Sequence, residues 1–385
     1  MNDVRGRAEG LLREPVRRAD LAIAFDESVA STVDVQVEGR NFFPPMLRDI
    51  ASASSSVHIT QFGFKPGTIG EEFATTLLAK ASEGIPVRLV VDGQGSRPSG
   101  SSRKFYERLR AGGVEVCVVR ATRLWAPEQL GHFDHRKFVV VDGRTGWVGG
   151  AGVEDHFVDG RFHDLFVRVT GPVVAQLQLV FVASFRWLGG AIPPEEVDAL
   201  FPTHEDVADS APATVLHNAP GPYRPITTAI AEALDTAAST LDVVNPYVAD
   251  RGMIRRIEAA ALRGVQVRLF VPGQPNNLAC AAAQRFHHGA LLDAGVRILE
   301  HPSMLHAKAF VRDGEDVLVG TCNLEAWSLK RFFEIDLLVR SPGFAELFDE
   351  RFSIPAERAA TAGRPPAGIR ERAMARAFAT ISPLL

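Results

Sequence analysis

Short apolar runs and longer Ala/Leu-rich stretches alternate along the 385-residue chain. Runs rich in β-branched residues, such as residues 137–141 (KFVVV), predict strands. Stretches such as Glu71 to Ser82 and Met253 to Leu262 predict helices. The densest apolar segment, Val173 to Phe185, is interrupted by glutamines and is too short for a membrane span, so it predicts a buried helix. This alternation is typical of an α/β fold in which helices cover a mixed sheet.

The alternating pattern occurs twice. The segments Ser56–Phe62 and Gly84–Asp92 correspond in order to Thr240–Pro246 and Gly264–Pro272. An internal duplication of this kind predicts two similar structural units.

The duplication divides the chain into five predicted parts. Residues 201–222 are rich in Pro, Asp, Ala and Thr, which is typical of a linker between halves. We therefore expect an N-terminal extension over 1–40, a first half over 41–200, the linker over 201–222, a second half over 223–355 and an Ala/Arg-rich tail over 356–385.

Each half contains the same polar motif. His135, Lys137 and Asp142 in HRKFVVVD return as His306, Lys308 and Asp313 in HAKAFVRD. Side chains two positions apart on a strand share a face, so each histidine should project together with its lysine. Each aspartate has the opposite parity and precedes a glycine, and Asp-Gly between two apolar runs is a hairpin signal. The aspartates are therefore candidates both for the site and for a structural role at a turn.

Small residues follow each motif where the return strand of the hairpin should end. They are Gly149, Gly150 and Gly152 in GGAG, and Thr321 and Asn323 in GTCN. Backbone can approach a ligand closely at such positions. A histidine, an ammonium group and small residues are thus predicted to meet in each half.

With these motifs the chain resembles the phospholipase D superfamily, whose defining pattern is HxKxxxxD followed by G-[GS]-x-N. The resemblance covers roughly residues 41–355 and is strongest to the cardiolipin synthase-like branch. Supporting stretches are Gly84–Ser96, Asn245–Val248, Gly264–Gly273, Ala294–Glu300 and Asn323–Val339. It implies two pseudo-symmetric halves, each a mixed sheet flanked by helices, with one shared active site between them.

The resemblance also implies a mechanism that uses both histidines. One imidazole attacks the phosphorus of a phosphodiester to form a phosphohistidine, and the other protonates the leaving alcohol, without a metal ion or cofactor. Family precedent favours His135 as the nucleophile, and the sequence leaves open which of the two histidines attacks. Lys137 and Lys308 would neutralise the phosphate, and Asn323 would donate to one of its oxygens.

A carboxylate downstream of each motif is expected to fix the tautomer of its histidine. Asp164 and Glu334 stand at nearly equal distances from the histidines of their halves, and Asp336 and His163 are close competitors. Gly152 departs from the family pattern because it stands where Asn is usual. Backbone N–H groups of residues 149–152, or the cluster at residues 154–156, are the candidates to compensate.

Composition and charge narrow the range of functions that the chain could have. The formal net charge is −4 and the isoelectric point is near 6.3, which disfavours a protein that mainly coats nucleic acid. The first 25 residues carry acids among arginines and lack the apolar core of a secretory signal. We therefore expect a cytoplasmic protein, soluble or peripherally attached to the inner face of the membrane.

The resulting prediction is an enzyme that transfers or hydrolyses the phosphodiester bond of a phospholipid, with an alcohol or water as acceptor. The alternative is a metal-independent nuclease that uses the same residues. A scaffold without activity is disfavoured because both His/Lys pairs are complete. The sequence leaves open whether the reaction is transfer or hydrolysis, which head group is used, and the oligomeric state.

Overall fold

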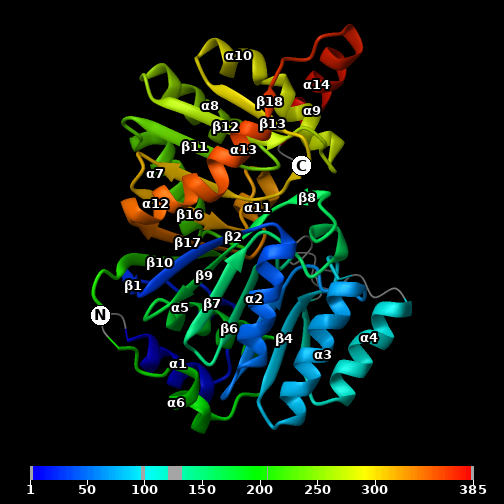
Figure 1. Ribbon diagram of the computed structural model, residues 1–385, viewed down its shortest axis with the longest axis vertical. Helices are drawn as coiled ribbons and strands as arrows, with labels where there is room; N and C mark the ends of the chain where they lie inside the picture. The colour runs from blue at the N-terminus through cyan, green and yellow to red at the C-terminus, as the bar shows by residue number, and fades with distance from the viewer. Residues whose placement is uncertain (1–2, 97–99, 120–131, 206, 383–385) are drawn as a thin grey trace.

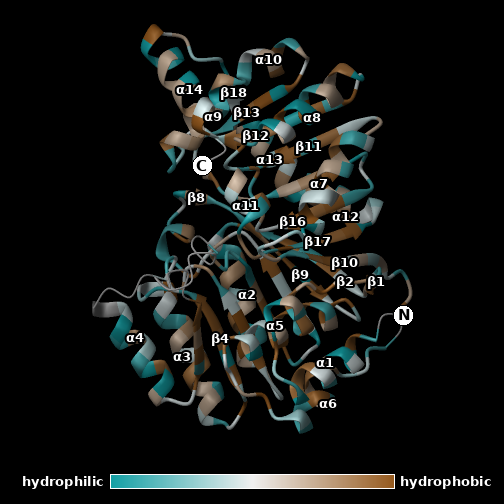
Figure 2. Ribbon diagram, turned by 180° about the vertical axis from the view of Figure 1, so that it is seen from behind, coloured by the Kyte–Doolittle hydropathy of each residue, from teal (hydrophilic) through white to brown (hydrophobic). Residues whose placement is uncertain are grey.

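The computed structural model describes residues 3–96, 100–119, 132–205 and 207–382. These residues form two mixed β-sheets, one in each half, with helices packed on their faces (Figure 1). Figure 2 shows hydrophobic residues concentrated in the strands and hydrophilic residues on the outer sides of the helices. The predicted α/β class with two pseudo-symmetric halves is confirmed.

The first sheet has seven strands. Its order is β2 (Thr32–Val37), β9 (Leu165–Thr170), β7 (Thr145–Gly149), β6 (Lys137–Val141), β3 (Val57–Gln61), β4 (Val87–Asp92) and β5 (Glu115–Val119). The helices α2 (Gly39–Ala51), α3 (Thr68–Ser82) and α4 (Gly100–Ala111) bury one face of this sheet. The helix α5 (Val174–Trp187), with α1 (Val4–Arg13) against it, covers the other face. The predicted buried helix at 173–185 is therefore confirmed.

The second sheet repeats this order and adds a short strand at each edge. Its order is β1 (Ser28–Ala30), β10 (Ala211–Asn218), β17 (Glu334–Arg340), β16 (Asp316–Gly320), β15 (Ala309–Arg312), β11 (Thr240–Val244), β12 (Gln266–Pro272), β13 (Arg297–His301) and β18 (Thr361–Ala362). Leaving out β1 and β18, each strand has its counterpart at the same place in the first sheet. The helices α7 (Pro225–Thr236), α8 (Arg251–Leu262) and α10 (His288–Asp293) pack on one face, and α12 (Pro342–Phe348) packs on the other.

Three predicted boundaries need correction. Residues 1–40 are not a separate extension, because β1 pairs with β10 and β2 pairs with β9, which puts one strand in each sheet. Residues 201–222 are not only a linker, because β10 pairs with β17 from Ala213 to Asn218 and so belongs to the second sheet. The tail also belongs to the fold: β18 pairs with β13, and α14 (Ile369–Ile381) packs along α9 (Leu278–Phe286).

The two halves are joined by backbone hydrogen bonds as well as by apolar packing. The short strand β8 (Phe162–His163) pairs with β14 (Met304–Leu305) of the other half. His306 N–H donates to the His163 carbonyl at 2.7 Å, and His135 N–H donates to the Phe333 carbonyl at 2.9 Å. One hydrophobic core also contains residues from both sheets. Each motif histidine is thus fixed by the backbone of the opposite half.

The two Asp-Gly pairs form the predicted hairpins. Asp142 and Gly143 have φ values of 54° and 61°, and Asp313 and Gly314 have 54° and 66°. Positive φ at both central residues is the requirement of the tight turns that suit twisted hairpins. The sequence therefore places at each turn a residue pair that tolerates this backbone.

The Asp142 carboxylate also anchors the chain before β3. It accepts hydrogen bonds from the backbone N–H groups of Ser54, Ser55 and Ser56 at 2.8–3.1 Å. Asp313 accepts from Ala238, Ser239 and Thr240 in the second half in the same way. Partial burial opposes the charge, but the Ser56, Ser54 and Ser55 amides outweigh it and lower the pKa of Asp142.

No helix among the described residues is both long enough and apolar enough to span a bilayer.

Replacing Asp142 by Asn tests this anchoring role. Asn tolerates the left-handed turn conformation but lacks the charge that strengthens the hydrogen bonds. We expect urea denaturation at pH 7 to show a free energy of unfolding about 1–2 kcal/mol below wild type. Because the folded-state pKa is lowered, the contribution of the carboxylate is present above the ordinary Asp pKa of about 3.9 and is lost in more acidic solution. The difference should therefore shrink as the pH falls below that value; equal stability at pH 7 would contradict the anchoring role.

Candidate active site

A cavity of about 460 Å³ lies where the two halves meet, and both motif histidines line it. Lys137 and Asn323 also line this cavity. Lys308 is buried immediately behind His306, with its Nζ 3.2 Å from the Nε2 atom of that ring. The structure thus brings the two predicted His/Lys pairs to one place.

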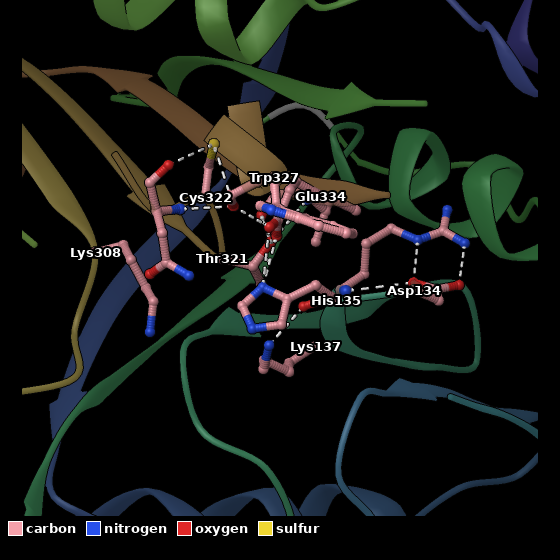
Figure 3. Close-up of polar contacts among 12 residues, drawn as sticks. Asp134, His135, Lys137, Lys308, Thr321, Cys322, Trp327 and Glu334 are labelled. Carbon is pink, nitrogen blue, oxygen red and sulfur yellow. Dashed lines mark hydrogen bonds and ion pairs between the residues drawn. The ribbon is translucent and has the colours of Figure 1, made fainter. Parts of the chain in front are cut away.

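His135 is oriented by a carboxylate of the second half. Its Nδ1 lies 2.9 and 3.0 Å from the two oxygens of Glu334, as Figure 3 shows. The hydroxyl groups of Thr321 and Ser328 donate to the same carboxylate. With its Nδ1–H committed to Glu334, the imidazole keeps its lone pair on Nε2.

His306 is oriented by a carboxylate of the first half. Its Nδ1 lies 2.7 Å from Asp164 Oδ2, and Asp164 Oδ1 accepts the backbone N–H of Leu165 at 2.8 Å. Chain order had suggested that each carboxylate serves the histidine of its own half. The pairing is crossed instead, because β8 and the residues before β17 reach across the boundary between the sheets.

The competing orienters have other contacts. Asp336 accepts the backbone N–H groups of Thr321 and Cys322 at 2.8 and 3.2 Å, so it holds the segment that carries Thr321. His163 stacks on His301 with ring centroids 4.3 Å apart, and its Nδ1 lies 3.4 Å from Glu38. The side chain of neither residue is hydrogen-bonded to a motif histidine, although the His163 carbonyl accepts the backbone N–H of His306.

Some of the remaining predicted residues line the cavity, and the others hold the backbone or the side chains around it. Asp142 and Asp313 do not line the cavity, so their predicted place in the catalytic set is corrected to the anchoring role at the turns. Thr321 acts through Glu334. Gly149 makes room for β9, since a Cβ there would lie 2.3 Å from the Leu165 carbonyl oxygen. Gly150 makes room for the Asp164 carboxylate, since a Cβ there would lie 2.4 Å from Asp164 Oδ1.

Gly152 and Asn323 both line the cavity, at equivalent positions of the two halves. Asn323 is buried, and among the described residues its Oδ1 has no hydrogen-bond partner. In the first half, Glu154 and His156 line the wall beside Gly152. Two members of the cluster predicted as a candidate to compensate for the missing Asn therefore line the cavity, whereas Asp155 accepts the backbone N–H groups of Thr68 and Ile69.

Other cavity residues carried no sequence signal of their own. Aromatic side chains form much of the wall: Phe62, Phe157, Phe162, Trp327 and Phe332. Phe62 packs edge-on against His135 at a centroid distance of 4.9 Å, and Phe157 packs similarly against His306 at 5.4 Å. Ser328 was also missed, although it lies in the stretch 323–339 that carried the family resemblance. Lys65 stands out only when the two halves are aligned, because the equivalent position of the second half is an alanine and this lysine is therefore not part of the repeated pattern.

Burial and the paired lysines together set the charge of the site. Burial lowers the pKa of both motif histidines. The charge of the neighbouring lysine, Lys137 for His135 and Lys308 for His306, lowers it further, and the pKa of His306 falls to about 3. Burial also lowers the pKa of Lys137 to about 7 and that of Lys308 to about 8. A bound anion would favour the charged form of all four groups. The site is therefore prepared to gain positive charge when a phosphate enters.

The two carboxylates differ. Burial raises the pKa of Glu334 to about 7 against the attraction of Lys137. Burial also acts on Asp164, but the hydrogen bond from His306 and the charges of His306 and Lys308 outweigh it and lower the pKa of Asp164. Asp164 therefore stays ionised beside its histidine down to a lower pH than Glu334 does.

Within the described part of the chain, no group of three or more His, Cys, Asp or Glu residues is arranged to hold a metal ion.

Comparison with known proteins places the chain in a family. A family model described as cardiolipin synthase, PLD-like domain, matches residues 46–183 and 230–354. Cardiolipin synthase A of Pseudomonas putida (strain W619) is 30% identical over 338 residues, which are 85% of this chain and 69% of that protein. The major cardiolipin synthase of Bacillus subtilis (strain 168) is 27% identical over 317 residues, 80% of this chain and 65% of that protein. The chain thus spans about two thirds of the length of these relatives.

Solved structures share the fold at low sequence identity. Phosphatidylserine synthase from Haemophilus influenzae Rd KW20 has a TM-score of 0.73 at 12% identity, over all of both chains. Polyphosphate kinase from Porphyromonas gingivalis has a TM-score of 0.58 at 13% identity, over 97% of this chain and 56% of that one. The chain belongs to the phospholipase D superfamily, and within it to the cardiolipin synthase, PLD-like domain family.

Proposed function

We propose that the protein is an enzyme that transfers the phosphatidyl group of a phospholipid to an alcohol, with water as a competing acceptor. The observation that carries this proposal is the crossed pair of imidazole–carboxylate contacts around one cavity, His135 with Glu334 and His306 with Asp164. The names of the related proteins, cardiolipin synthase and phosphatidylserine synthase, support a phospholipid as the substrate.

The chemistry would proceed in two displacements. Nε2 of His135 attacks phosphorus, the bond to the leaving alcohol breaks, and protonated His306 gives that alcohol its proton. The acceptor then loses its proton to His306 as its oxygen attacks the phosphohistidine, and the P–N bond breaks. Lys137 and Lys308 would balance the charge of the phosphate, and Asn323 would donate to one of its oxygens.

The difference between the carboxylates supports this division of roles. A general acid must carry a proton when the alcohol leaves, and ionised Asp164 beside His306 stabilises an imidazolium. Glu334 has a raised pKa and stabilises positive charge on His135 less well. His135 is therefore better suited to remain neutral and attack.

The aromatic wall and the net charge favour a lipid over nucleic acid. The cavity has no row of exposed basic residues to follow a polyanionic backbone, among the residues that the structure describes, and the chain is acidic overall. Nuclease activity is thus the less favoured alternative.

Alanine substitution of either motif histidine tests the two-step reaction. Labelled phosphatidylglycerol is supplied with glycerol, and released head group, phosphatidic acid and new diester are separated; plasmid nicking is measured in parallel. His135→Ala and His306→Ala should each lower turnover by at least about 10²–10⁴-fold, because each step needs both groups. His287→Gln is the matched control, since that half-buried histidine lies outside the cavity.

Near-normal turnover in either histidine variant would contradict the shared site. Nicking of plasmid without any cleavage of lipid by the wild type would favour the nuclease alternative.

A membrane-facing surface would bring the cavity to its substrate. On α9, Leu278 and Phe286 are 74% and 44% exposed; on α14, Met374 and Ile381 are 52% and 42% exposed. Met374 and Ile381 are seven residues apart and so share a face of α14. We call these four side chains the α9–α14 apolar face.

Its position and charge suit an anionic bilayer. The residues Asn277 and Cys280, at the start of α9, line the cavity, so the face adjoins the site. Arg370, Arg372 and Arg376 lie on α14 with a single acid, Glu371, which is paired with Arg364. Exposed apolar side chains among arginines are typical of helices that lie in a membrane interface. Peripheral attachment to the inner face of the membrane through this surface is therefore our proposal.

Sedimentation with lipid vesicles tests this surface. Wild type should bind phosphatidylcholine vesicles that contain phosphatidylglycerol and should bind pure phosphatidylcholine vesicles more weakly. The double variant Leu278→Glu/Met374→Glu should lose most of this binding, because carboxylates replace apolar contacts and repel the anionic surface. Leu262→Glu is the control: Leu262 is 70% exposed and is the last residue of α8, a helix that Figures 1 and 2 show at the other side of the second half from α9 and α14. Equal binding by the double variant and wild type would exclude the face.

A further inference from the structure

One residue beside the site has a strained backbone. Glu38, between β2 and α2, has φ 68° and ψ 141°. Among the residues that the structure describes, the other non-glycine residues with positive φ are Asp142, Asp209 and Asp313. Aspartate tolerates positive φ because its short side chain can bond to nearby backbone, and glutamate lacks this advantage. The conformation of Glu38 also lies near a region that essentially only glycine occupies, and such a residue persists only where its surroundings hold it.

The shared architecture of the two halves does not require this strain. By the register of β2 with β9 and of β10 with β17, the equivalent of Glu38 in the second half is Asn218. Asn218 pairs with Glu334 as the last residue of β10, without a positive φ. Its side chain accepts the backbone N–H of Ile226 at the start of α7 instead. The strain at Glu38 is therefore a feature of the first half alone.

Two contacts impose this backbone on Glu38. Its N–H donates to the Asp164 carbonyl at 2.8 Å. A Cβ at Gly39 would lie 2.3 Å from the Phe157 carbonyl oxygen, so the chain passes directly against Phe157. Asp164 bonds to Nδ1 of His306, and the Phe157 ring packs against the same histidine. The strained turn thus touches two of the residues that surround His306.

The carboxylate of Glu38 orients the ring of His163, the residue before Asp164. Its Oε1 lies 3.4 Å from His163 Nδ1. The ring stacks on His301 and on Phe352 of the second half, at centroid distances of 4.3 and 5.3 Å. Stacking alone does not distinguish the two flipped orientations of an imidazole. Among the described residues His163 Nε2 has no hydrogen-bond partner, so the contact with Glu38 selects the orientation.

This contact also keeps Glu38 charged. The hydrogen bond from His163, with a further contribution from Arg40, outweighs partial burial and lowers the pKa of Glu38. The group that faces the His163 ring at neutral pH is therefore a carboxylate.

We propose that Glu38 is a positioning residue for His306. It contacts both members of the dipeptide His163-Asp164, through its carboxylate and its backbone N–H, and this dipeptide holds His306 at its backbone N–H and at Nδ1. The inference rests on the proposed function, in which His306 is the general acid, and adds a residue outside the cavity lining. Glycine would fit this backbone without strain but would supply no carboxylate.

Glu38→Ala and Glu38→Gly separate the strain from the positioning role. Both remove the carboxylate, so each should lower kcat for release of head group from phosphatidylglycerol about tenfold and leave KM within about twofold of wild type. Only glycine relieves the backbone, so thermal denaturation should give Glu38→Gly the higher Tm of the two. Glu38→Gln should recover most of kcat, because its amide oxygen still accepts from His163.

The ¹⁵N resonances of the histidine rings supply a readout that a general loosening of the fold would not reproduce. In Glu38→Ala the Nδ1 resonance of His306 should shift, while that of His135 stays close to wild type. Asp209→Gly is the matched control, because Asp209 also has a positive φ, of 64°, but is exposed and lies outside the cavity lining. This variant should keep the wild-type kcat and both resonances.

An unmoved His306 resonance in Glu38→Ala would overturn the positioning role, whatever the rate. Equal shifts of His135 and His306 would also overturn it, since Glu38 would then support the fold in general. A Tm of Glu38→Gly below that of Glu38→Ala would contradict the strain. Failure of the wild type to release any head group would instead overturn the proposed function, and the His306 resonance would still decide the role of Glu38.

Discussion

Two dipeptides, His163-Asp164 and Phe333-Glu334, hold the motif histidines of the opposite halves. In each, the carbonyl of the first residue accepts the backbone N–H of a motif histidine, and the carboxylate of the second bonds to Nδ1 of the same histidine. Position and tautomer of each imidazole are therefore set by the other half. Neither half contains a complete site, so the interface between the sheets must form before the chemistry is possible.

Burial of this interface determines its electrostatics. The site keeps two histidines and two lysines away from water, which lowers the pKa of each. Burial makes it unfavourable for these four groups to carry a positive charge. A bound phosphate reduces this penalty, because its negative charge favours the protonated form of each group. In the proposed mechanism, substrate binding would thus also prepare the general acid. The opposite pKa shifts of Asp164 and Glu334 are the basis on which we propose different roles for the two histidines.

The sequence was sufficient for features that depend on local pattern. The duplicated HxK motifs, the Asp-Gly hairpins and the buried helix at 173–185 each follow from residues close together in the chain. The crossed pairing could not be found this way, since it depends on how β8 and β17 meet the opposite sheet. Strand β10 was missed because Pro212 and its alanines are typical of a linker, yet its pairing with β17 makes it a strand.

The crossed pairing is tested most directly by ¹⁵N NMR of the histidine ring nitrogens in wild type, Glu334→Gln and Asp164→Asn. The resonances of the two motif histidines are assigned with His135→Gln and His306→Gln. The account predicts that Glu334→Gln changes the Nδ1 resonance and the titration of His135 while His306 stays close to wild type, and that Asp164→Asn does the reverse. A change confined to the histidine of the same half in each variant would contradict it.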